Sequence, residues 1–145
     1  MSTPSRLRLE VITPGGVVFR DDVDYVEAPA LFGYIGILPG HAPLLYQIRS
    51  GQLQYRQGEE EHYLAVHWGF LEVLDDTVTV LAETAERPQD IDLARAESAL
   101  NRAKARLEEF GAAYDVEQAQ QAVARAEARL KAAEAEADVG SRSPT

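Results

Sequence analysis

The spacing of apolar residues changes at Pro88, and this change constrains the fold more than any other feature of the chain. Before Pro88 the spacing has a period of two: Leu7, Leu9 and Val11 alternate with polar neighbours, as in a half-buried strand. Turn residues separate the short apolar runs that follow, at Pro14-Gly15, Pro39-Gly40 and Asp75-Asp76. Short strands separated by turns at intervals of roughly 8–12 residues are typical of a sandwich or barrel. We therefore predict an all-β domain over residues 1–87.

Residues 88–138 show the three-and-four spacing of paired helices. The first apolar seam consists of Leu93, Ala96, Leu100, Ala103, Leu107 and Phe110. The second seam consists of Val116, Ala119, Val123, Ala126, Leu130, Ala133 and Ala137. Two such helices joined by a few residues are expected to pair antiparallel, which gives an α+β chain: an all-β sandwich followed by a two-helix hairpin. The last segment, residues 139–145, has no pattern and is predicted to be a disordered tail.

Both seams are rich in alanine, so the helices can approach closely but bury little apolar area. At about 25 cal/mol per Å² this packing is marginal, and we expect the hairpin to be able to open or to dock elsewhere. Asp90 and Asp92 are expected in the first helical turn, where carboxylates interact favourably with the helix dipole.

The composition excludes several classes of function. Cysteine is absent, which removes disulfides, thiolate metal sites and cysteine nucleophiles. No apolar run approaches the ~20 residues that a membrane-spanning helix needs. The net charge of −10 argues against a nucleic-acid partner, because phosphates are bound by basic surfaces. We expect a cytosolic protein that requires no cofactor and that reaches a membrane only through a partner.

Motifs for catalysis or metal binding are not found in the sequence. It contains neither a phosphate-binding loop with its lysine nor a nucleophile elbow. The glycines at positions 33, 36 and 40 are interpreted as turns, because neither a helix nor a lysine follows them. The histidines are His41, His62 and His67, and the last two are five residues apart on a predicted strand. That spacing places them on opposite faces, so we predict no catalytic or metal site.

Four arginines of the helical half form two pairs. Arg95 and Arg102 are seven residues apart and share one face of the first helix, beside Asp92. Arg125 and Arg129 are four apart and share one face of the second. If the seams meet, the four guanidiniums could converge, an arrangement that suits polyphosphate recognition. The alternative, which spacing alone favours, is that they are solvated flanks paired with nearby glutamates.

Three segments carry a family resemblance: 36–45 (GILPGHAPLL), 69–73 (GFLEV) and 78–87 (VTVLAETAER). They resemble the epsilon subunits of bacterial F-type ATP synthases, and the resemblance runs from about Leu7 to Leu130. It implies a sandwich of about ten strands that binds the gamma subunit and rests on the ring of c subunits. It further implies a non-catalytic rotor subunit that couples proton flow to ATP synthesis. Such a subunit is peripheral, at the cytoplasmic face of the bacterial cell membrane, and forms no stable homo-oligomer.

The resemblance also implies contact residues for the ring and for gamma. Tyr34, Gly40 and His41 lie in the segment that matches the ring-facing region of the family. Tyr34 stands where the family commonly has a glutamate, so a ring contact here would have to be apolar or use other residues. Trp68, preceded by His67, stands where the family commonly has Ser-Gly and is expected to alter the surface facing gamma.

Within the family, the hairpin is folded against the sandwich or extended along gamma into the catalytic alpha/beta head, where it inhibits ATP hydrolysis. Some bacterial members bind ATP in the folded state through a motif that stands here as IDLARA, residues 91–96. The implied ATP-binding residues are Glu86, Ile91, Asp92, Arg95, Ala96, Arg102, Arg125 and Arg129. ATP would then be an allosteric ligand and not a substrate. Asp92 and Arg95 could equally pin the hairpin to the sandwich.

Two other functions remain open from the sequence. One is a purely structural rotor subunit without nucleotide sensing. The other is an unrelated β-sandwich binding module whose coiled-coil tail drives oligomerisation.

Overall fold

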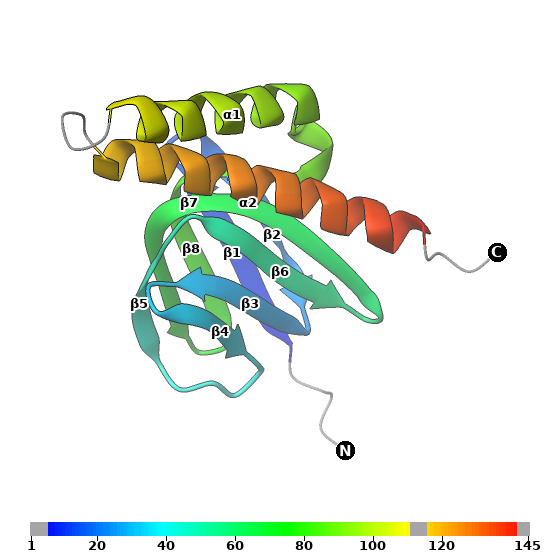
Figure 1. The fold of residues 1–145 in the computed structure, drawn as a ribbon. Coiled ribbons are helices and arrows are strands. Elements are labelled where there is room, and N and C mark those ends of the chain that lie inside the picture. The colour runs from blue at the N-terminus through cyan, green and yellow to red at the C-terminus, as the bar shows by residue number, and fades with distance from the viewer. Residues whose placement is uncertain (1–5, 111–115, 142–145) are drawn as a thin grey trace, which may run out of the picture.

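The computed structural model describes residues 6–110 and 116–141, which form eight strands, one short 3-10 helix and two α-helices (Figure 1). In chain order the elements are β1 (Leu7–Thr13), β2 (Gly16–Val23), β3 (Tyr25–Ala30), β4 (Gly33–Ile37), β5 (Leu44–Ile48), β6 (Gly51–Gln57), β7 (Glu60–Leu74), β8 (Thr77–Glu86), η1 (Pro88–Asp90), α1 (Leu93–Phe110) and α2 (Val116–Ser141). All strands precede all helices, so the change of periodicity at Pro88 predicted the α+β order correctly.

The strands form one hydrogen-bonded sheet, in the order β2-β1-β8-β7-β5-β3-β4, that folds over on itself. β6 lies off this path and pairs with both β3 and β7, which closes the sandwich. Neighbouring strands are antiparallel except β1 and β8, which are parallel. Aliphatic side chains at alternate positions fill the interior, as the period-two pattern predicted. The largest fully buried ones are Leu7, Leu9, Ile37, Ile48, Leu53, Leu64 and Leu71.

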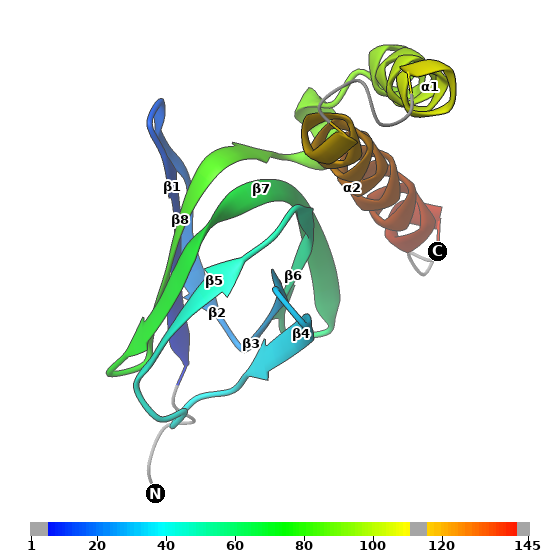
Figure 2. The same cartoon turned by 60° about the vertical axis from the view of Figure 1, so that its left-hand side comes forward.

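β7 is the longest strand and belongs to both layers of the sandwich. Its first half pairs with β6 and its second half with β5, so the strand curves across the molecule (Figure 2). The bend lies at Trp68 and Gly69, whose φ angles are 42° and 155°. A side chain at Gly69 would place its Cβ 1.8 Å from the carbonyl oxygen of Leu81, so only glycine fits there.

The count of about ten strands was wrong for the described residues, which form eight. The apolar runs at residues 63–67 and 70–74 are not separate strands but the two halves of β7. The glycine between them bends the strand without ending its hydrogen bonding, because β8 pairs with β7 on both sides of the bend.

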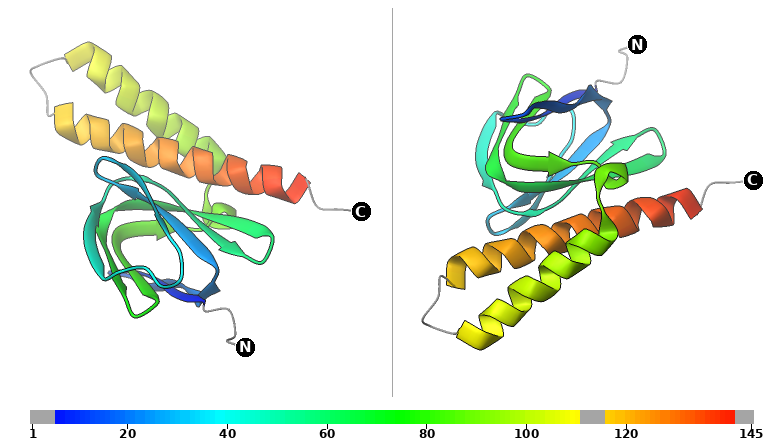
Figure 3. Two further views of the ribbon diagram at one scale, coloured as in Figure 1. Left: turned by 90° about the horizontal axis from the view of Figure 1, so that it is seen from below. Right: turned by 90° about the horizontal axis from the view of Figure 1, so that it is seen from above.

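The two helices form an antiparallel hairpin that is docked on the sandwich (Figure 3). α2 contacts β7 and β6, and α1 lies outside it, packed on α2 (Figure 2). Ala96 and Ala103 of α1 and Ala126 of α2 are buried at seam positions, as predicted. Leu93 was also assigned to the seam, but it lies at the first position of α1 and is 49% exposed.

A second apolar face of α2 was not predicted. Ala128 and Ala132 are buried against Ala65 of β7, with Tyr63 and Ile91 at the edge of this cluster. The two alanines are four residues apart and so lie on one face of the helix. α2 therefore packs through one alanine-rich face on α1 and through another on the sheet.

The helix ends differ from the prediction in two places. α1 begins at Leu93, so Asp90 and Asp92 precede its first turn; Asp90 belongs to η1 and Asp92 is the N-cap. α2 continues to Ser141, so residues 139–141 are helical and do not belong to a disordered tail. The rest of the predicted tail, residues 142–145, lies outside the described residues. Within residues 6–110 and 116–141, no helix is long and apolar enough to cross a membrane.

Candidate functional site

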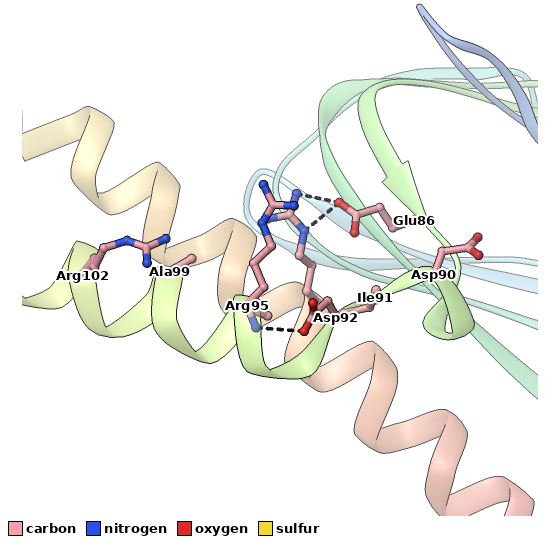
Figure 4. Close-up of a pocket in the computed structure, with 9 residues that line it drawn as sticks. Glu86, Asp90, Ile91, Asp92, Arg95, Ala99 and Arg102 are labelled. Carbon is pink, nitrogen blue, oxygen red and sulfur yellow. Dashed lines mark hydrogen bonds and ion pairs between the residues drawn. The ribbon is translucent and has the colours of Figure 1, made fainter.

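A cavity of about 400 Å³ lies where the end of β8, η1 and both α-helices meet (Figure 4). Its lining residues are Glu86, Asp90, Ile91, Asp92, Arg95, Ala96, Ala99, Arg102 and Arg129. The sheet contributes Glu86, α1 contributes Arg95 and Arg102, and α2 contributes Arg129. Because separate elements supply the walls, the cavity exists only while the hairpin is docked on the sandwich.

An ion pair between Glu86 and Arg129 joins the sheet to α2 at one wall of the cavity. Nε and Nη2 of Arg129 lie 2.7 Å and 2.6 Å from the same carboxylate oxygen of Glu86. The side chains are 30% and 29% exposed, respectively, so solvent screens the pair only in part. The pair holds α2 against β8 and fixes the guanidinium of Arg129 at the cavity.

Asp92 sets the start of α1 and thereby the position of Arg95. Oδ1 of Asp92 accepts a hydrogen bond from the backbone N–H of Arg95 at 3.0 Å, and its carbonyl accepts the first helical bond from Ala96. Arg95 and Arg102 then project from the same side of α1 (Figure 4). In the part of the chain that the structure describes, neither guanidinium has a hydrogen bond or ion pair. Two cationic groups therefore line the cavity without a partner among the residues that the structure describes.

Arg125 does not line this cavity. Its Nη1 lies 3.1 Å from Nε2 of His67 on β7, one helical turn before Arg129. The expected convergence of four guanidiniums is therefore realised by three, those of Arg95, Arg102 and Arg129. The physical reason is that α2 faces the sheet at Arg125, where His67 offers a buried acceptor.

His67 is the one buried polar side chain among the described residues, with 3% of its surface exposed. Burial and the adjacent guanidiniums of Arg125 and Arg129, against the raising effect of Glu83, together lower the pKa of His67 from 6.5 to about 4, and burial is the largest of these causes. The imidazole is therefore neutral near pH 7. Arg125 can only donate, so Nε2 accepts, and Nδ1 carries the proton that it donates to Oγ of Ser50.

Sequence reasoning missed the role of His67. The spacing of His62 and His67 excludes a shared site but does not indicate a partner on another element. The available signal was a polar residue flanked by apolar neighbours, Val66 and Trp68, at a position expected to be a strand interior. Its partner is 58 residues away in the chain, so no spacing rule connects the two.

The expected contact residues for the ring and for gamma lie in two separate places. The N–H of Gly40, next to His41, donates to Asp76 at 2.7 Å, which ties this loop to the β7–β8 turn. Tyr34 is 51% exposed and lies under the guanidinium of Arg49, with 5.9 Å between its ring centroid and Cζ. Trp68 is half-buried beside α2. It lines a second cavity of about 270 Å³ with Leu31, Arg49, Ser50, Gln120, Gln121 and Ala124.

An apolar patch on the outer face of the sandwich was not predicted. It consists of Leu45 on β5, Phe70 on β7 and Leu81 on β8, which are 69%, 53% and 53% exposed. Phe70 and Leu81 are paired across the two strands. Within the described ranges, no three His, Cys, Asp or Glu side chains are grouped so that they could hold a metal ion.

Two family models match this chain. The β-sandwich domain of the ATP synthase delta/epsilon chain matches residues 6–88, and the long α-helix domain of the same chain matches residues 89–134. The chain belongs to the ATP synthase delta/epsilon chain family. Its fold, a sandwich followed by two helices, is the one that these two domain models describe.

Individual members of the family are similar over most of their length. An ATP synthase epsilon chain 2 of Syntrophotalea carbinolica is 51% identical over 104 residues, which cover 72% of this chain and 75% of the relative. An ATP synthase epsilon chain of Koribacter versatilis is 49% identical over 102 residues, which cover 70% and 72%. Another from Desulfosudis oleivorans is 52% identical over 103 residues, which cover 70% and 77%.

Solved structures share the fold at lower identity. One chain in the mitochondrial ATP synthase of Euglena gracilis, in an assembly of OSCP, F1 and c-ring, matches with a TM-score of 0.77 at 23% identity. The match covers 92% of this chain and 84% of that one. A chain from the central stalk and c-ring of the Tetrahymena thermophila enzyme matches with a TM-score of 0.54 at 13% identity, over 93% and 98%.

Proposed function

We propose that this chain is a non-catalytic subunit of the central stalk of a proton-translocating F-type ATP synthase. Family membership and the epsilon-chain relatives support this proposal. The sandwich would bind the gamma subunit and the c-ring and so take part in coupling proton flow to ATP synthesis. It would sit at the cytoplasmic face of the bacterial membrane through these partners.

Exposed apolar side chains on the outer face of the sandwich favour binding of a protein partner there. Leu45, Phe70 and Leu81 are exposed apolar side chains on β5, β7 and β8, and groups of such side chains commonly mark protein contacts. We assign gamma to this patch. Trp68 and Tyr34 would contribute only at the margin near α2, while Gly40 and His41 would serve a contact at the other end of the sandwich.

We further propose that the hairpin is an ATP-controlled switch. A ligand shifts a conformational equilibrium only through its preference for one state. The cavity draws its walls from β8, η1, α1 and α2, so a ligand that fills it binds the docked hairpin and no other arrangement. At low ATP the hairpin would be free to extend toward the alpha/beta head and inhibit hydrolysis.

The observation that carries this proposal is the pair of guanidiniums of Arg95 and Arg102, which line the cavity and have no partner among residues 6–110 and 116–141. Together with Arg129 they offer planar, permanently charged donors to a triphosphate. The carboxylates of Glu86, Asp90 and Asp92 are acceptors for the ribose hydroxyls or the amino group of adenine. Arg125 would join the site only by leaving His67.

Calorimetric titration of the full chain with ATP, with and without magnesium, tests the switch. We expect saturable one-to-one binding that weakens at least tenfold in Arg95→Ala and in Arg102→Ala. Arg106→Ala is the matched control, because Arg106 lies exposed on the same helix but outside the cavity. No binding at millimolar ATP, or equal affinity in all variants, would overturn nucleotide sensing.

The ion pair between Glu86 and Arg129 favours a second candidate, in which these residues only dock the hairpin and the subunit is purely structural. An ATP synthase assembled with a chain truncated after Arg87 separates the two. A regulatory hairpin predicts faster ATP hydrolysis by the truncated complex, and a structural one predicts an unchanged rate.

A further inference from the structure

A buried contact between the sheet and α2 lies beside the candidate ATP cavity and does not belong to it. Nε2 of His67 accepts a hydrogen bond from Nη1 of Arg125, and Nδ1 of His67 is bonded to Oγ of Ser50 in the β5–β6 turn. Arg129 and Glu86 separate this contact from the cavity, and they also line the small void next to His67. One ring nitrogen of His67 is thus bonded within the sandwich and the other to the hairpin.

This contact requires a neutral imidazole. An arginine donates only, so the bond exists only while Nε2 keeps its lone pair. A proton on Nε2 removes the acceptor and places a second cation against Arg125, on an imidazole that is almost fully buried.

The other charged groups around His67 do not compensate for such a proton. Arg129, from the same helix as Arg125, adds a further positive charge nearby. On β8, Glu83 lies 3.7 Å from Nε2, but its side chain is 68% exposed and therefore screened. Ser50 and Trp68 also contact His67, but neither carries a charge. The ring of Trp68 meets the imidazole edge-on.

We propose that His67 is a protonation-sensitive anchor of the hairpin: the neutral imidazole binds Arg125 and holds α2 on the sandwich, and protonation releases it. The anchor depends on the docking interface and not on ATP. It therefore stands whether or not the neighbouring cavity binds nucleotide.

The sign of the pH dependence follows from the two states of the hairpin. In the docked state the pKa of His67 is about 4, while a released His67 moves toward its ordinary value of 6.5. The released state therefore binds more protons between these values, so docking is full above about pH 6.5 and weakens as the pH falls. From pH 7.5 to pH 5.5 the docking equilibrium constant is expected to fall about tenfold.

Thiol labelling of the full chain measures this constant, because the chain contains no cysteine. Ala132→Cys places a thiol in the buried face of α2 that lies on the sheet, where reagent reaches it only when α2 leaves. The opening constant, corrected with the labelling rate of an unfolded peptide, is expected to rise about tenfold from pH 7.5 to pH 5.5. In the same background, His67→Gln keeps an acceptor and a donor but cannot titrate, and it is expected to remove this dependence.

His62→Gln is the matched control, because His62 lies on the same strand but pairs with Glu60. It is expected to keep the pH dependence of the parent chain. An opening constant that does not change with pH in the parent, or that changes equally in His67→Gln, would overturn the proposal.

A second measurement serves if the His67→Gln chain does not fold. Titration of the imidazole proton signals of the full chain by NMR is expected to show a His67 midpoint well below 6.5. Arg125→Ala is expected to raise this midpoint. A midpoint near 6.5, or one that does not respond to Arg125→Ala, would contradict the anchor.

Discussion

The interior of the sandwich and the interface between sandwich and hairpin contain different types of side chain. The interior contains fully buried leucine, isoleucine and valine side chains, each worth about 1.5–3 kcal/mol on burial. The interface contains the small side chains of Ala65, Ala128 and Ala132, together with the polar contacts of Arg125 and Arg129. The sandwich is therefore stabilised by apolar burial, whereas the hairpin is docked through small side chains and charged groups.

The largest expected effect comes from a substitution in the interior of the sandwich. Leu71→Ala removes a fully buried side chain and is expected to lower the free energy of unfolding by about 2–5 kcal/mol. Urea denaturation followed by circular dichroism measures this loss. Leu74→Ala on the same strand is the control, because Leu74 is exposed and its truncation is expected to change stability by less than about 0.5 kcal/mol.

The next prediction concerns the ion pair of Glu86 and Arg129 at the interface between sandwich and hairpin. Glu86→Gln keeps the size of the side chain but removes the charge that binds Arg129, and it is expected to weaken docking by about 1 kcal/mol, since the pair is partly screened. The opening constant of a thiol at position 132 reports this change. If the urea midpoint of the sandwich moved as much as the opening constant, the two regions would not be independent.

The start of α1 gives an effect of similar size. Asp92→Ala removes the N-cap and is expected to destabilise the hairpin by about 0.5–2 kcal/mol, while Asp92→Asn keeps a capping oxygen and most of the stability. Helix content measured by circular dichroism distinguishes the variants. Equal helix content in both would mean that packing on α2, and not the cap, fixes the start of α1.

The smallest expected effect concerns salt. The anchor at His67 is buried, whereas the ion pair of Arg6 and Asp24 is exposed on the sandwich. Raising the salt concentration from 0.1 M to 1 M is therefore expected to leave the contact of Arg125 nearly unchanged, because buried contacts are screened much less than exposed ones. The opening constant of a thiol at position 132 is measured at both salt concentrations, in the parent chain and in His67→Gln. The difference between the two chains reports the salt dependence of the Arg125 contact. A strong salt dependence that vanished in Arg125→Ala would show that the contact is open to solvent.

Much of the candidate site was predictable because its residues are close in sequence or share a helix face. Ile91, Asp92, Arg95 and Ala96 fall within one motif, and Arg102 lies two turns further along the same face of α1. These residues all line the cavity, and that they bind ATP stays a prediction. The role of Asp92 as an N-cap was not predicted, because the start of a helix is less certain in sequence than its interior.

Arg125 marks the limit of that reasoning. Its spacing of four from Arg129 places both on one face of α2, and this is correct. Which of the two faces the cavity depends on the surface beneath the helix, where His67 binds one and Glu86 binds the other. Neither partner follows from helical periodicity.

The sequence by itself determined that the strands precede the helices, and which side of β1 faces the core. These features are set by local hydrophobic periodicity, which is legible within a window of a few residues. Only the tertiary structure decided how α2 rests on β7, that His67 is buried, and that three arginines and not four surround the cavity. These features depend on contacts between residues far apart in the chain. The alanine residues of α2 that face the sheet cannot be told by periodicity from those that face α1, and the bend at Gly69 sets the course of β7.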